Sequence, residues 1–275
     1  MVNNIIFNDV WDIDIAFEMT LLAIASFSIV YASISYMGNR LREALVGGLI
    51  STILPIGALI ILYSHLLKPE IAHLIFLSFQ TRSWMLYGAS GVSLLILLSL
   101  LFSISIKLGV NKSITKILGL LAAAIGVFVS IYPGLLLSYE RGIPFWNGSA
   151  LPISSLLMGL VGGSSVYMIL RPFDRRISTV NGISLLALVI IYILHIYSMW
   201  KYPLGSYTIG LMLRDPIFIT GTALALIGGF LGLTPITSKN KNKYISLIIA
   251  ILGLASIFIL RYTLLIYGAW EYPLI

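Results

Sequence analysis

The sequence predicts an all-α polytopic membrane protein, with about eight transmembrane helices in one compact bundle. Of its 275 residues, 59% are hydrophobic and only 10% are charged, whereas soluble proteins carry about 25% charged residues. The apolar residues form continuous runs and do not alternate with polar ones. Continuous runs favour helices over a β-barrel, because a helix satisfies its own backbone hydrogen bonds inside the bilayer.

Eight apolar runs are long enough to cross a bilayer, which takes about 20 helical residues. They are predicted at 14–37, 44–66, 84–106, 114–138, 150–171, 180–200, 215–236 and 244–268. The first, third, fifth and seventh spans end at short basic links, which look like plain topology signals. The second, fourth and sixth spans end at longer and richer links. Because no link could hold a soluble domain, residues 1–275 are predicted to form a single integral membrane domain.

The distribution of basic residues predicts the orientation of the chain. Eleven of the 17 lie in the links after the odd-numbered spans: Arg40, Arg42, Lys107, Lys112, Lys116, Arg171, Arg175, Arg176, Lys239, Lys241 and Lys243. Five lie on the other face: Lys68, Arg82, Arg141, Lys201 and Arg214. This bias predicts a multi-pass protein of the cell membrane with both termini extracytoplasmic. The net charge of +7 is explained by topology, so the expected partner is the lipid membrane and no nucleic acid.

The composition also limits the cofactors. The chain has no cysteine, which excludes thiolate metal sites and iron–sulfur clusters held by this chain alone. Three histidines leave little room for a metal site, and none is predicted. Loops that carry function tend to be the elaborate ones, so the functional face is expected to be the extracytoplasmic one.

Two carboxylates begin the first span. Asp14 and Glu18 are four residues apart and therefore share a helix face. Glu18 is expected about one turn below the outer surface, where a carboxylate is costly unless it is paired or faces a wet cavity. It is either a proton acceptor and ligand hydrogen-bonding group, or an interfacial acid that reaches the surface or pairs with another helix.

Other ionisable side chains lie within the spans or at their ends. Arg261, in the last span, either pairs with Glu18 or contacts a ligand oxygen. His65 ends the second span, and His195 lies in the outer third of the sixth. Each is an interfacial histidine, a quinone ligand or, least favoured, an axial haem ligand. Tyr132 precedes Pro133, which frees a backbone carbonyl and opens a gap in the helix. Tyr132 is therefore either a ligand for a buried polar group or an ordinary packed tyrosine.

Three segments carry a resemblance to a known family. A span ends in IYPGLLLS, the following loop reads IPFWN, and a helix then begins with LP, all within residues 131–152. Residues 73–89 end in Ser83-x-Met85-x-x-Gly88, and the last span contains LRYTLLIYG from Leu260. In this order the segments resemble the NrfD/PsrC family, the polysulfide-reductase-type membrane subunits of respiratory oxidoreductases.

The resemblance implies a quinone-reactive membrane anchor subunit of a respiratory molybdopterin oxidoreductase. It would exchange electrons between membrane quinol, such as menaquinol, and an iron–sulfur partner subunit that serves a molybdopterin catalytic subunit. Terminal substrate reduction, for example of polysulfide or sulfur, would occur on that partner chain, and this chain would hold no haem. The alternative is an ion- or solute-translocating membrane subunit without a quinone site.

The resemblance also assigns roles to residues. Tyr132 matches the family's quinone-pocket tyrosine, while Asp14 and Glu18 stand where some members have Asn and His. Glu18 and Tyr132 are thus the expected catalytic residues, and the expected quinone-binding set is Asp14, Glu18, His65, Tyr132 and Arg261. The Pro144–Asn147 turn is expected to be a structural or docking element.

Overall fold

A computed structural model describes residues 12–66, 68–77, 83–140, 143–172, 174–234 and 243–268. Within these ranges, eight helices are long and apolar enough to cross a membrane, which confirms the predicted all-α membrane fold. They are α1 (Ile13–Met37), α2 (Leu41–His65), α4 (Trp84–Lys107), α5 (Lys112–Tyr139), α6 (Ala150–Leu170), α7 (Arg175–Met199), α9 (Pro216–Leu233) and α11 (Lys243–Gly268). Arg82, Arg141, Lys239, Lys241 and both chain ends lie outside the described residues.

Helix boundaries differ from the predicted spans where capping decides them. Helix α7 begins at Arg175, five residues before the predicted start at 180, because the Asp174 side chain accepts a hydrogen bond from the Arg176 N–H and caps the helix. Two short helices, α3 (Leu74–Leu77) and α8 (Pro203–Met212), lie in the longer links, for which no helix was predicted. Helix α8 buries Ile209 and Met212 completely, so its amphipathic side belongs to the core.

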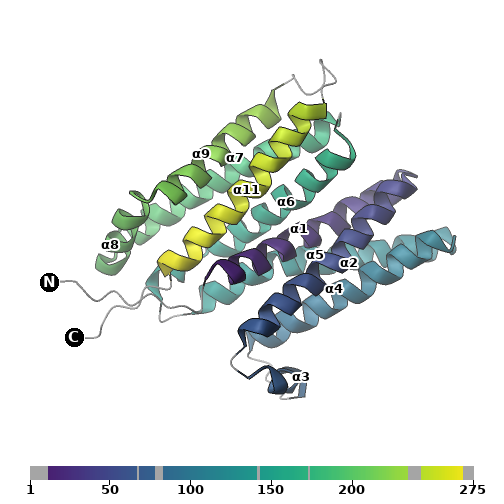
Figure 1. Ribbon diagram of the computed structural model, residues 1–275, viewed down its shortest axis with the longest axis horizontal. Helices are drawn as coiled ribbons and strands as arrows, with labels where there is room; N and C mark the ends of the chain where they lie inside the picture. The colour runs from purple at the N-terminus through teal and green to yellow at the C-terminus, as the bar shows by residue number, and fades with distance from the viewer. Residues whose placement is uncertain are drawn as a thin grey trace.

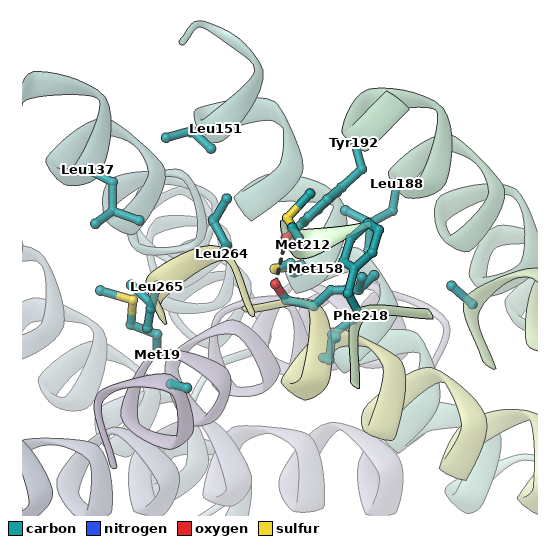
Figure 2. Close-up of a cluster of buried hydrophobic side chains, with 14 of the residues drawn as sticks. Met19, Leu137, Leu151, Met158, Leu188, Tyr192, Met212, Phe218, Leu264 and Leu265 are labelled. Carbon is teal, nitrogen blue, oxygen red and sulfur yellow. Dashed lines mark hydrogen bonds between the residues drawn. The ribbon is translucent and has the colours of Figure 1, made fainter. Parts of the chain in front are cut away.

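The spanning helices form two groups of four (Figure 1). Helices α1, α2, α4 and α5 pack together, as do α6, α7, α9 and α11, and the groups meet where α1 and α5 contact α6 and where α1 contacts α11. One apolar cluster fills the first group, around Leu95, Phe102 and Val129. A larger cluster, drawn in Figure 2, joins the second group to the junction. At the junction α1 and α6 approach closely, since a Cβ on Gly163 would lie 2.5 Å from the Phe27 Cβ.

The turn between α5 and α6 is anchored to the second group of helices. It forms a 3-10 helix over Pro144–Trp146. The Trp146 side chain is fully buried, and its Nε1–H donates a 3.0 Å hydrogen bond to the Leu264 carbonyl in α11. The Phe145 carbonyl accepts a 2.9 Å hydrogen bond from His195 Nε2 in α7. These bonds favour the structural interpretation of the turn.

The two ends of the bundle differ. Helix α1 begins, and α11 ends, at the end that also carries α3 and α8 (Figure 1). The links after α1, α4 and α6 lie at the opposite end, because consecutive spans are antiparallel. The elaborate links and the predicted site residues therefore share one end of the molecule. The assignment of that end to the extracytoplasmic face stays a prediction.

Candidate functional site

A cavity of about 260 Å³ opens within the first group of helices, near the end where α1 begins. Residues from α1, α2, α4 and α5 line it, together with Leu66 just after α2. They are Ile15, Glu18, Met19, Leu22, Leu59, Leu62, His65, Leu66, Met85, Gly88, Ala89, Val92, Tyr132, Pro133 and Leu136. Most of this wall is aliphatic. Three of the five predicted quinone-binding residues, Glu18, His65 and Tyr132, therefore meet at one cavity.

Glu18 is the acid of this cavity. Its side chain is only 5% exposed, and no hydrogen bond or ion pair to it occurs in the part of the chain that the structure describes. A buried polar group without a protein partner loses the hydrogen bonds that it would make in water. This loss is offset if a water molecule or a ligand in the cavity supplies the missing partner. The observation favours the ligand interpretation of Glu18 over the snorkelling one.

Tyr132 lies across the cavity, on α5. Its ring packs beside Phe128, with 6.5 Å between the ring centroids, and its hydroxyl has no hydrogen-bond partner among the described residues. The ring is seated against Gly88 of α4, where a Cβ would overlap it. Glycine at position 88 therefore creates the space that holds the phenol at the cavity wall.

His65 connects the cavity to the surface. It is the last residue of α2, and its Nε2–H donates a 3.1 Å hydrogen bond to Asp12 Oδ2. Its Nδ1 has no hydrogen-bond partner and lies 3.9 Å from Asp14 Oδ2. A proton taken up at Nδ1 would therefore face a second carboxylate. Asp14 itself is exposed outside the cavity wall, so its place is at the mouth and not among the lining residues.

Asp12, Asp14 and His65 bring three potential ligand atoms within 4.8 Å of one another, a spacing that a cation could bridge. Their grouping already has another explanation. Asp12 Oδ1 accepts hydrogen bonds from the N–H groups of Asp14 and Ile15 and so caps α1. Asp12 Oδ2 accepts the His65 bond. We therefore assign these residues to helix capping and to the cavity mouth.

Arg261 lies behind the cavity. It is 2% exposed on α11, and its guanidinium donates a 3.0 Å hydrogen bond to Met158 Sδ. It does not line the cavity, and its charge interacts with Glu18 without a contact within 4 Å. His195 is also buried, in the second group of helices, where it bonds Phe145. The expected role of Arg261 as a quinone ligand stays a prediction.

Comparison with known protein families identifies the family of this chain. The family model for polysulfide reductase, of the NrfD type, matches residues 5–273, which is nearly the whole chain. The chain belongs to this polysulfide reductase family. It is a multi-pass membrane subunit of that family. No curated protein matches it significantly.

Two of the three sequence segments that resemble the NrfD family meet at the cavity. Met85 and Gly88 come from the Ser83-x-Met85-x-x-Gly88 segment, and Tyr132 comes from the segment that begins the Ile131–Leu151 stretch. Sequence reasoning did not single out Asp12 as a site residue. The available signal was its position immediately before an apolar run, where Asp is a preferred helix N-cap.

Low pH should destabilise the N-terminal end of α1 in this NrfD-family chain. Burial raises the pKa of the Asp12 carboxyl, but the hydrogen bonds from His65 and from the Asp14 and Ile15 N–H groups outweigh burial and leave the pKa below its ordinary value of 3.8. A lowered pKa in the folded state means that ionised Asp12 stabilises the fold above pH about 4, and that this stabilisation is lost as the pH falls further. Below pH 4, Asp12→Asn should therefore flatten the pH dependence of unfolding, followed by circular dichroism in detergent. The exposed Glu70→Gln is the control, and an equal effect of both substitutions would contradict this role.

Proposed function

We propose that this chain is the quinone-reactive membrane anchor subunit of a respiratory molybdopterin oxidoreductase complex of the polysulfide- or sulfur-reductase type. It exchanges electrons between membrane quinol and an iron–sulfur partner subunit. The observation that carries this proposal is the apolar cavity, which two oxygen-bearing side chains, buried Glu18 and half-buried Tyr132, line without protein partners among the described residues. Family membership supports the same conclusion.

The cavity suits a quinone head group. Its volume of about 260 Å³ is close to the lower end of ligand sites, about 300 Å³, so it fits a ring and not a whole isoprenoid lipid. Aliphatic walls suit the ring faces, and polar groups on α1 and α5 suit the two ring oxygens. Met85, which lines the cavity, is 46% exposed on the outer surface of the bundle. A tail could leave beside it into the bilayer.

Quinol oxidation releases two electrons and two protons. Glu18, as a carboxylate, would take the proton of one quinol hydroxyl, while the Tyr132 hydroxyl would hold the ring in place. Glu18 would pass this proton to Nδ1 of His65, whose Nε2–H is held by Asp12, and Asp14 would release it to water at the mouth. The proton of the second hydroxyl would then follow the same route. These groups lie at one end of the bundle, so the protons would be released at that end.

The electrons must leave this chain. Without cysteine it has no ligands for an iron–sulfur cluster of its own, so the acceptor in this proposal is a cluster of the partner subunit docked at the cavity end. The translocating alternative has weaker support. Among the described spans, the buried charged side chains are Glu18 and Arg261, which lie toward the same end and leave no charged route across the membrane.

Replacing Tyr132 with phenylalanine tests the proposal. Loss of one hydrogen bond of about 1.4 kcal/mol should raise the quinol concentration for half-maximal turnover about 10-fold. The measurement is quinol-dependent reduction of the partner clusters in the purified complex. Tyr139→Phe, on the same helix but 54% exposed, is the control. Unchanged kinetics in the Tyr132 variant would remove this tyrosine from the site.

A further inference from the structure

A second concave surface, the basic basin, lies at the end of the bundle opposite the quinone cavity. Its volume is about 750 Å³, and it is lined by four arginines, Arg40, Arg171, Arg175 and Arg176, with Asp174, Leu170 and Pro172. Arg40 comes from the link between α1 and α2, and the other arginines come from the link between α6 and α7 and the start of α7. Helix α1, which has 25 residues and is about 37 Å long, runs from the end with the cavity to the end with the basin.

The acids near the basin are already paired. Arg171 lies 2.8 Å from Asp174 Oδ2 and 3.6 Å from Glu43 Oε1. In the described part of the chain, Arg40, Arg175 and Arg176 form no ion pair. Three guanidinium groups therefore share one concave surface without a protein counter-charge.

Two of these cations lie at the positive end of a helix dipole, which is electrostatically unfavourable for them. Arg175 and Arg176 are the first residues of α7, where the dipole is positive and favours anions. The same dipole, together with three unpaired guanidinium groups, strengthens the attraction for an anion of more than one charge. Arginine also matches phosphate geometry with paired N–H donors, which lysine cannot do.

We infer that the basic basin binds the phosphate of an anionic phospholipid in the leaflet at this end of the bundle. Basic pockets between transmembrane helices are suited to lipid head groups, and half-buried Leu170 and Pro172 offer apolar contacts beside the arginines. Topology signals alone do not require this arrangement. The junction of α4 and α5 at the same end also has three exposed lysines, Lys107 at the end of α4 and Lys112 and Lys116 at the start of α5, and none of them lines the basin. The inference is independent of the proposed quinone chemistry.

The test is native mass spectrometry of the detergent-solubilised protein, purified with any subunits that accompany it and titrated with phosphatidylglycerol, cardiolipin, phosphatidylcholine or inorganic phosphate. Three variants are compared with the unsubstituted protein. The basin variant carries Arg40→Gln, Arg175→Gln and Arg176→Gln. The matched control carries Lys107→Gln, Lys112→Gln and Lys116→Gln, which removes the same charge at the same end. A third variant replaces the same arginines with lysine and so preserves the charge that sets topology.

We expect the basin variant to bind anionic lipid at least about 10-fold more weakly than the unsubstituted protein. The lysine control should bind it normally, and the arginine-to-lysine variant should bind it several-fold more weakly. Retention by the basin variant, or equal loss in the lysine control, would overturn the inference. Phosphate that displaces the lipid at equal concentration would also overturn it, in favour of a free-anion site. If the Gln variant does not fold, normal lipid binding by the arginine-to-lysine variant would overturn it.

Discussion

Replacing Glu18 with glutamine is expected to lower quinol oxidation by about 100-fold or more, because positioned acid–base groups contribute about 10²–10⁴ to rates. Glutamine has nearly the same shape and still hydrogen-bonds, but it cannot take a proton. Since Glu18 is 5% exposed and has no protein partner among the described residues, its replacement breaks no hydrogen bond that holds the helices together. The complex should assemble normally. The rate is measured as quinol-dependent reduction of the partner clusters, in a complex whose subunit content has been checked on a gel.

The matched control is Glu70→Gln, because Glu70 is an exposed acid in the short 3-10 helix after α2, at the same end of the bundle. It should leave the rate unchanged. If Glu18→Gln oxidised quinol at the normal rate, Glu18 would not be the proton acceptor, and His65 would become the first candidate. If both substitutions slowed the reaction equally, the effect would belong to the surface charge and not to the cavity.

Replacing Gly88 with alanine is expected to lower turnover by about 30-fold or more. A Cβ at this position would overlap the Tyr132 ring, so the ring must move into the cavity. Overpacking of this kind costs about 1–3 kcal/mol, and the displaced phenol also loses its bond to the ligand. The measurement is binding of a fluorescent quinol analogue to the purified protein, together with turnover of the complex.

Gly57→Ala is the control for the added methyl group. Gly57 lies in α2, and a Cβ there would meet only Leu21 Cδ1, at 3.9 Å, an ordinary contact. This variant should bind the analogue normally. Normal binding by Gly88→Ala as well would contradict the position assigned to the Tyr132 ring.

The spans could be predicted from the sequence because bilayer thickness dictates their length. Some helix ends differ from the predicted ones because of capping. Helix α7, for example, begins before its apolar run because Asp174 caps it. Helix α8 was not predicted, because its ten residues are too few to cross a membrane and its burial of Ile209 and Met212 depends on neighbouring helices.

The candidate site was predictable in part. Depth along a helix can be counted from the sequence, which placed Glu18 near the outer surface, and the family resemblance added Tyr132 to the expected site; both line the cavity together with His65. Which way a side chain points depends on helix packing, so the contact between Arg261 and Met158 could not be predicted from the sequence. Packing also brings two basic links, separated by more than 100 residues, into one basin, although each alone resembled a topology signal.

Photolabelling is the most direct test of the quinone cavity. The protein would be irradiated with a menaquinone analogue that carries a photoreactive group on its ring, and labelled residues would be mapped by mass spectrometry. We expect labels on cavity residues such as Met19, Met85 and Leu136, and we expect excess menaquinol to abolish them. Labels confined to the lipid-facing surface, or labels that menaquinol does not compete away, would contradict a quinone site in this cavity.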